Sequence, residues 1–171
     1  MRLLKSTVHP TINPLSSKKF TRIATRAITL KGQNILLLYT KRYDDFSLPG
    51  GGINAEESLK ECLIRELKEE TGARGISDIQ PFGLYEEYRP WHKADYDLVH
   101  MKSYCYTCVI DEVLDSPSFE LHEINNGMSP LWINIHQAIA HNQKTMAESK
   151  KKGLSIERET YLLTLIAEQL L

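Results

Sequence analysis

The sequence predicts one mixed α/β domain, in which β-strands pack against amphipathic helices. A length of 171 residues is typical of a single domain and is sufficient to bury a sizeable core. Hydrophobic residues make up 42% of the chain and charged residues 25%, which is the balance of an ordinary globular protein. Short apolar runs of strand type flank a helical pattern over residues 55–71, so both kinds of element are expected.

Charge and cysteine content narrow the function classes. The net charge of −1 gives no electrostatic reason to bind a nucleic-acid polymer or an anionic membrane. The sequence has no apolar run of membrane-spanning length and no signal-peptide core at its N-terminus. Three cysteines do not make a disulfide framework. We therefore expect a cytoplasmic protein whose partners are small molecules.

The first part of the chain predicts an arm and a hairpin. Residues 1–19 contain two prolines and a polar cluster, so they are expected to form a loosely held N-terminal arm with room for one short strand. Strands over residues 23–30 and 35–39 should then form a hairpin around the turn at 31–34. The run at 35–38 is continuously apolar, which indicates a strand covered on both faces.

Three basic residues near this hairpin each allow two interpretations. Arg26 interrupts the first strand, either as a charge facing a sheet edge or as a contact to a phosphate or base. Lys41 and Arg42 follow the second strand, either in solvent or close enough to the next glycine-rich loop to meet phosphate. All three are candidate substrate-binding residues.

Residues 55–71 are predicted to form one helix with an unusual stripe. Its apolar residues recur at three- and four-residue spacing: Leu59, Cys62, Leu63 and Leu67. At about 100° per residue, Glu66 and Glu70 lie in the same arc, and Glu69 lies at its edge. Gly72 stands where a helix C-cap is expected.

Acidic residues on a core-facing arc need an explanation. Like charges at this spacing repel one another, and burial increases that cost unless a cation is present. Inward-facing carboxylates are the ligands that a hard divalent cation, Mg²⁺ or Mn²⁺, requires. The alternative is an ordinary acidic helix face in solvent.

The spacing around this helix favours the cation. Gly51 is followed after five residues by Glu57, and after seven more by the run Arg65–Ala73. This pattern resembles the Nudix box, Gly-x5-Glu-x7-Arg-Glu-U-x-Glu-Glu-x-Gly-U, in which U is aliphatic. Seven fixed identities at these offsets make the signal specific. The resemblance extends over roughly residues 20–140.

The resemblance implies a fold and an activity. The fold would be the Nudix fold, a mixed β-sheet packed between helices in an α/β/α sandwich, over residues 20–143. The activity would be metal-dependent hydrolysis of a pyrophosphate bond in a nucleoside diphosphate linked to another group, such as a nucleoside triphosphate, a sugar nucleotide or ADP-ribose. The expected cofactor is Mg²⁺ or Mn²⁺. Arg65 would orient a box carboxylate. The implied metal ligands are Gly51, through its carbonyl, with Glu57, Glu66, Glu69 and Glu70.

Residues 79–88 and 99–110 are predicted to be strands joined by an aromatic loop. Three aromatic side chains are candidates for stacking on a base or ribose, with packing as the alternative: Tyr88, Trp91 and Tyr96. Cys105 and Cys108 form a C-x-x-C, which invites a metal or redox interpretation. Positions three apart on a strand point to opposite faces, so we expect two separate core cysteines.

The long polar stretch at 111–128 is expected to be a functional loop. Since some Nudix proteins recruit a carboxylate from this loop as general base, Glu120 and Glu123 are the candidates. A strand near residues 130–133 and a helix capped by Asn134 should follow.

Residues 144–171 are expected to form a charged linker and a last amphipathic helix. The helix should begin near Ser155 and carries too much apolar surface for a free tail. It is expected to pack on the domain or against a second copy in a homodimer.

Two alternative functions are compatible with the same scaffold. A non-catalytic Nudix-fold nucleotide sensor would be free to lose the box acids, whereas this chain keeps them all. An isomerase of the isopentenyl-diphosphate type needs a catalytic cysteine, and Cys62 lies inside the box helix. Tyr88 and Pro90 straddle the place where some subfamilies carry a substrate marker. The sequence therefore leaves the nucleotide substrate open.

Overall fold

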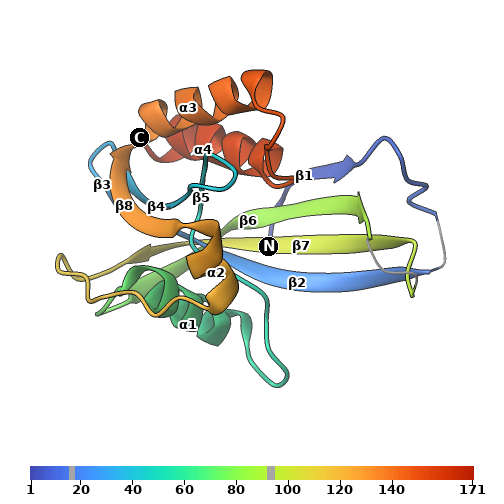
Figure 1. Cartoon of the computed structure of the whole chain (residues 1–171). Coiled ribbons are helices and arrows are strands. Elements are labelled where there is room, and N and C mark those ends of the chain that lie inside the picture. The colour runs from blue at the N-terminus through green and yellow to red at the C-terminus, as the bar shows by residue number, and fades with distance from the viewer. Residues whose placement is uncertain (16–17, 92–94) are drawn as a thin grey trace.

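Helices enclose strands that gather into two sheets (Figure 1). The computed structural model describes residues 1–15, 18–91 and 95–171. Its elements, in chain order, are β1 (Leu3–Val8), β2 (Lys19–Ile28), β3 (Leu30–Lys31), β4 (Asn34–Thr40), β5 (Asp45–Ser47), α1 (Leu59–Thr71), β6 (Ser77–Pro90), β7 (Leu98–Val109), α2 (Leu121–Asn126), β8 (Met128–Asn134), α3 (Ile135–Glu148) and α4 (Ile156–Leu170).

Both sheets contain strands that are distant in the sequence. The first has the order β1-β6-β7-β2, with β6 and β7 antiparallel and the two outer strands parallel to their neighbours. In the second, β4 pairs antiparallel with β3, β5 and β8. An isolated bridge between Ala24 and Gly52 joins β2 to the glycine-rich loop, residues 48–52. This loop is therefore fixed against the first sheet.

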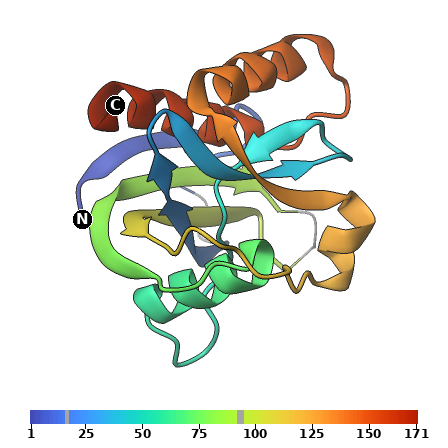
Figure 2. The same cartoon turned by 90° about the vertical axis from the view of Figure 1, so that its left-hand side faces the viewer.

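Helices cover the sheets from two sides. In Figures 1 and 2, α3 and α4 lie on one side and α1 on the other. Ile35 and Leu37 of β4 pack into the core formed with α3 and α4. Leu36 points the opposite way and packs with Leu63 and Leu67 of α1. Because consecutive strand residues alternate in direction, the prediction of a strand covered on both faces is confirmed, as is the α/β/α arrangement.

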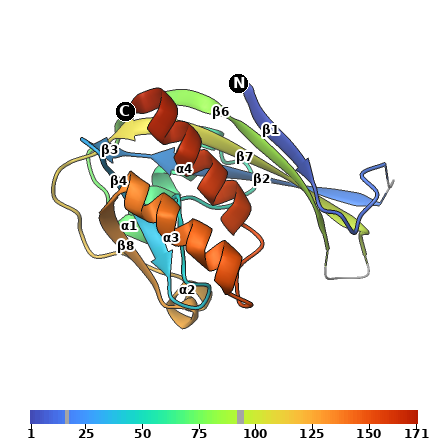
Figure 3. The ribbon, with the colours of Figure 1, turned by 90° about the horizontal axis from the view of Figure 1, so that it is seen from above.

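Three strands project beyond the helices as an arm, which is distinct from the N-terminal arm expected at residues 1–19. β2, β6 and β7 continue to one side of the molecule in Figures 1 and 3. Near its end the ring of Phe20 lies 5.1 Å from that of Trp91 and 5.6 Å from that of Tyr96. Residues 92–94 of the expected aromatic loop lie outside the described residues. Trp91 and Tyr96 are thus partly engaged by packing.

The two cysteines of the C-x-x-C lie in different cores. Cys105 packs on the α3–α4 side of the sheets and Cys108 on the α1 side. Both are free and buried, as is Cys62. The expectation of two separate core cysteines is confirmed.

Helix boundaries differ from the sequence prediction at two places. α1 begins at Leu59 and not at residue 55, because Ser58 caps it. The Ser58 side chain accepts the Glu61 N–H, and the Glu61 carboxylate accepts the Ser58 N–H, which together form a capping box. The stretch at 111–128, predicted to be loop, contains α2, a six-residue helix too short to show periodicity.

The C-terminal region is part of the domain core. Asn134 caps α3 as predicted, accepting the His136 N–H, but α3 continues to Glu148. The domain boundary expected at residue 143 therefore falls inside a helix. Leu162, Leu163 and Ile166 of α4 are fully buried in the core: their exposed fractions are 0%. None of the helices in the described ranges has the length and apolarity needed to cross a membrane.

Asp45 at the start of β5 makes stability depend on pH. Burial, then the charges of Glu159 and Asp44, raise the pKa of Asp45 from 3.8 to about 6. Because the folded state holds this proton more tightly, Asp45 stabilises the fold least above pH 6 and progressively more as pH falls towards 4. Relative to wild type, Asp45→Asn should therefore gain about 2 kcal/mol of unfolding free energy between pH 4.5 and 7.5.

Urea unfolding of both proteins at the two pH values measures this difference and cancels the titration of other carboxylates. An equal gap between the two proteins at pH 4.5 and 7.5 would contradict it.

Candidate functional site

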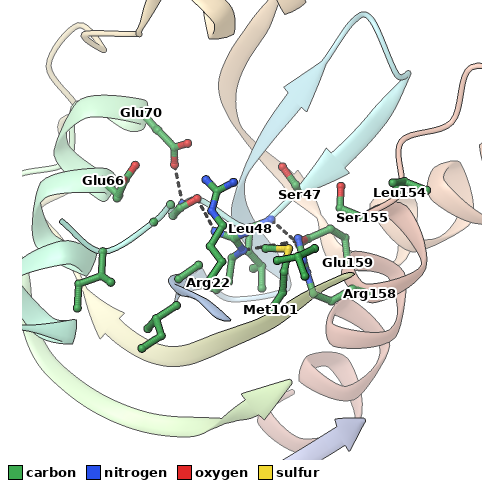
Figure 4. A pocket seen from close by; sticks show the side chains of 18 of the residues that line it. Arg22, Ser47, Leu48, Glu66, Glu70, Met101, Leu154, Ser155, Arg158 and Glu159 are labelled. Carbon is green, nitrogen blue, oxygen red and sulfur yellow. Dashed lines mark hydrogen bonds and ion pairs between the residues drawn. The ribbon is translucent and has the colours of Figure 1, made fainter. Parts of the chain in front are cut away.

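A cavity of about 920 Å³ opens between the glycine-rich loop, α1, the arm and the start of α4 (Figure 4). Glu66 and Glu70 of α1 lie on one side of it. Arg158 and Glu159 of α4 lie on the other. Residues from β2, α2 and the arm complete the lining. The helix singled out from the sequence therefore forms one wall of this cavity.

Glu70 is the most deeply buried of the box acids. Its exposed fraction is 4%, and its Oε2 accepts the Gly50 N–H at 2.6 Å. Burial raises the pKa of Glu70 well above its ordinary value, against the lowering effect of this hydrogen bond. An anionic carboxylate here is unfavourable without a cation. The sequence prediction of an inward-facing acid is met at this position.

Two glycines of the loop lie close to other parts of the site. Gly50 has φ +139°, and a Cβ on it would lie 2.1 Å from the Thr25 carbonyl oxygen. A Cβ on Gly51 would lie 2.4–2.6 Å from the Glu66 carboxylate. Only a bare backbone lets the loop approach α1 so closely. The main chain of the loop and the acids of the helix thereby form one surface.

Exposure increases from Glu70 outward along α1. The Glu66 side chain is 13% exposed and that of Glu69 is 43% exposed. Burial raises the pKa of Glu66, opposed by its hydrogen bond from Arg65. The helical arc drawn from the sequence, with Glu69 at its edge, describes this gradient correctly.

Arg65 connects the glycine-rich loop to three acids through hydrogen bonds. Its Nε and Nη2 donate to the two carboxylate oxygens of Glu57 at 2.7 and 3.0 Å. Its Nη1 donates to Glu66 at 2.8 Å and to Glu69 at 3.1 Å. The bidentate pair with Arg65 lowers the pKa of Glu57 to about 2. Both Glu57 oxygens are thus engaged by Arg65, an arrangement suited to bracing the loop.

The three basic candidates of the hairpin lie in different places. Arg26 lines the cavity but is only 9% exposed, and its Nη1 donates to the carbonyls of Thr25 and Gly50. It is therefore a buried charge on the edge strand β2, not a solvent-exposed one. Lys41 and Arg42 do not line the cavity. Arg42 donates to the Asn126 side chain in α2, so the structure separates these two residues from the box acids.

The two candidate bases differ sharply. Both line the cavity, but Glu123 is only 8% exposed and accepts the Glu120 N–H at 2.6 Å. Its charge adds to burial and to Glu66 in raising the pKa of Glu70, so the two carboxylates lie near each other. The Glu120 side chain is 72% exposed and pairs with His122 at 3.1 Å. The structure favours Glu123.

A family model described as NUDIX domain matches residues 20–155. The chain belongs to the Nudix family. Gly51–Ala73 is therefore its Nudix box, and the resemblance recognised from the sequence is confirmed.

Curated relatives match a shorter segment. Human diphosphoinositol polyphosphate phosphohydrolase NUDT4B is 28% identical over 106 residues, covering 61% of this chain and 52% of its own length. Mouse diphosphoinositol polyphosphate phosphohydrolase 2 is 27% identical over the same extent. The chain thus spans about half the length of the curated relatives it matches. A solved Nudix hydrolase from Nitrosomonas europaea is 15% identical with a TM-score of 0.56, covering 80% of this chain and 95% of its own, which shows a shared fold.

The Nudix box offers oxygen donors that suit a divalent cation. Glu66, Glu70 and the Gly51 carbonyl border the same hollow, and hard cations prefer oxygen ligands. The Gly51 oxygen accepts the Thr25 N–H at 3.0 Å and a weak hydrogen bond from the Cys62 thiol at 3.6 Å, which a cation could replace. Within the described parts of the chain, no three acidic, histidine or cysteine side chains already stand grouped as ligands. The donor set fits the ion, with small side-chain adjustments.

Four charged residues that line the cavity were missed from the sequence: Arg22, Arg89, Arg158 and Glu159. Arg22 lies on β2, with Nη2 3.5 Å from where a Gly52 Cβ would be. Glu159 carried a readable signal. It falls three residues after Ile156 and four before Leu163, on the apolar stripe of α4, which is the same anomaly that marks the Nudix-box acids.

Proposed function

We propose that this protein is a metal-dependent hydrolase of a pyrophosphate bond in a nucleoside diphosphate linked to another group. The observation that carries the proposal is Glu70, buried at the wall of the cavity and held by the Gly50 N–H. A buried carboxylate of raised pKa among further acids is typical of a site that receives a cation and phosphate oxygens. The three free cysteines of the protein are compatible with a cytoplasmic location.

Glu66, Glu69, Glu70 and the Gly51 carbonyl are the proposed ligands of Mg²⁺ or Mn²⁺, which would neutralise phosphate charge and acidify a bound water. Glu57 and Arg65 brace this set. In the reaction, water attacks one phosphorus, and the bond from that phosphorus to the bridging oxygen breaks. Glu123 is proposed to take the proton from the attacking water.

Other cavity residues are proposed to hold the rest of the substrate. Arg22 has no ion-pair partner among the described residues, and its guanidinium suits a phosphate. Trp91 lines the cavity, donates to Asp95 and packs on Phe20, and its indole is of the type that stacks on a base or ribose. Arg26 is proposed to hold the loop through its hydrogen bonds to the Thr25 and Gly50 carbonyls. Lys41 and Arg42 have no proposed contact to substrate.

Glu123→Gln and Glu120→Gln form a matched pair for the base. Glu123→Gln should lower kcat by about 100-fold, because Gln cannot accept a proton yet keeps the acceptor for the Glu120 N–H. Glu120→Gln should change kcat by less than about threefold, since that side chain is 72% exposed and pairs with His122. Steady-state kinetics decides between them. A larger loss in Glu120→Gln would reverse the assignment.

A screen that separates the cleavage products by ion-exchange chromatography tests the function. The panel contains nucleoside triphosphates, sugar nucleotides, ADP-ribose and dinucleoside polyphosphates, each with Mg²⁺ and Mn²⁺. It also contains a diphosphoinositol polyphosphate, because two of the relatives are named for that substrate and Arg22 at the cavity offers a guanidinium to a phosphate-rich ligand. Tight binding in calorimetry without any cleavage product would favour the nucleotide sensor instead.

A further inference from the structure

Two charged residues at the start of α4 form a buried cluster beside the site. Arg158 and Glu159 are 3% and 0% exposed, and they lie beyond residues 20–155, which the family model matches. Glu159 Oε1 accepts hydrogen bonds from Arg158 Nε and Nη2 at 3.0 and 2.6 Å. Arg158 Nη1 donates to Glu87 of β6 at 2.6 Å. The cluster therefore ties α4 to the arm.

Glu159 also holds the glycine-rich loop at two points (Figure 4). Its Oε2 accepts the Leu48 N–H at 2.9 Å. Its Oε1 lies 3.9 Å from Arg26 Nε, and Arg26 Nη1 in turn donates to the Gly50 carbonyl. Gly50 also donates its own N–H to Glu70. A continuous set of contacts thus runs from α4 to the most buried acid of the Nudix box.

We infer that Glu159 is a positioning residue for Glu70, acting through Arg26 and the main chain at Gly50. Buried ion pairs can often be replaced by apolar side chains at no cost to stability, so burial of this cluster is weak evidence for a purely stabilising role. Gly50 is held at both its carbonyl and its N–H, so the orientation available to Glu70 is narrow. Misplacing a reacting group by about 1 Å can cost about 100-fold in rate. The catalytic part of this inference rests on the proposed function.

The Gly50 amide proton gives a readout that needs neither metal nor substrate. In the metal-free wild type it should exchange slowly with solvent, because it donates over 2.6 Å to a buried carboxylate. In Glu159→Leu, exchange measured by NMR should be at least about tenfold faster. In the metal-loaded enzyme, kcat should fall about tenfold while KM stays within about twofold. Glu159→Gln keeps the acceptor for the Leu48 N–H and should recover part of both losses.

Asn142→Leu is the matched control. Asn142 is also fully buried and holds the neighbouring strand β5 from α3, accepting the Phe46 N–H at 2.8 Å and donating to the Phe46 carbonyl at 2.9 Å. This variant should lose stability but leave the Gly50 amide and kcat unchanged. If Glu159→Leu does not fold, Arg26→Lys replaces it. Arg26 places Nη1 on both carbonyls and Nε beside Glu159, whereas lysine has a single nitrogen for these contacts, so the Gly50 amide should change in the same way.

Each outcome decides something separate. A Gly50 amide that is unaltered in Glu159→Leu, or altered equally in Asn142→Leu, would overturn the positioning role. A wild type that cleaves no substrate, while the Gly50 amide responds as expected, would overturn the proposed function and support the structural link.

Discussion

Glu70→Gln should lower kcat by at least about 100-fold and leave the metal-free protein as stable as wild type or more so. The loss in rate follows because the substitution removes a charged ligand from the proposed metal site. The stability follows because Glu70 is buried beside Glu66 and Glu123, so removing its charge relieves repulsion and desolvation. Glutamine still offers an oxygen to the Gly50 N–H. Turnover and thermal melts of the same preparation measure both effects.

Thermal melts with added Mg²⁺ separate the loss of a metal ligand from the change in stability of the metal-free protein. Ligand binding to the folded state raises the melting temperature by mass action, so wild type should gain more from Mg²⁺ than Glu70→Gln does. Glu61→Gln is the control, because Glu61 lies on the same helix but is exposed and serves the capping box. It should keep wild-type turnover. Full turnover in Glu70→Gln, or a loss explained by unfolding alone, would remove Glu70 from the metal site.

Gly72→Ala should cost about 3 kcal/mol or more in unfolding free energy, whereas Gly32→Ala should cost about 1 kcal/mol. Both glycines have positive φ, +71° and +58°, so both variants carry the same left-handed strain. A Cβ at Gly72 would also lie 1.9 Å from the Asp115 carbonyl oxygen, while a Cβ at Gly32 meets nothing within 4 Å. The difference between the variants isolates the steric term. Chemical denaturation measures it, and equal losses would show that the contact with Asp115 is easily relieved.

Gly72→Ala should also change the position of Glu123, the proposed base. The Asp115 N–H donates to the Gly72 carbonyl at 2.8 Å, and the Ser118 N–H donates to the Glu69 carbonyl at 2.7 Å. These bonds dock the segment that leads into α2, and with it Glu123, on the end of α1. A displaced Asp115 therefore disturbs the approach of Glu123 to the cavity.

Local patterns in the sequence predicted one wall of the site well. The spacing of Glu66, Glu69 and Glu70 on a helix specifies their order of burial, and Gly72 and Asn134 mark helix ends through local backbone chemistry. These features depend on residues a few positions apart, so periodicity and capping rules reach them. Where the helix began was less clear, since the Ser58 capping box starts the helix later than the apolar pattern suggests.

The opposite wall depends on contacts that no local pattern encodes. Glu159 binds the Leu48 N–H across 111 residues of sequence, so nothing near either residue announces the bond. Arg26 was left between an edge charge and a phosphate contact because its surroundings, Gly50 and Glu159, come from two other elements. The burial of Glu123 depends on α2, whose six residues are too few for a helical period. Tertiary placement, not residue type, decides these roles.

The contact between Leu48 and Glu159 also bears on the order in which the site forms during synthesis. A ribosome releases the glycine-rich loop and the whole Nudix box well before α4 leaves the exit tunnel. Until then the Leu48 N–H lacks its acceptor, and Arg26 lacks the carboxylate that faces it. The Tyr161 hydroxyl meets the Leu4 carbonyl only then as well, 157 residues from its partner. The nascent chain therefore holds every box acid before it holds the anchor of the loop those acids face.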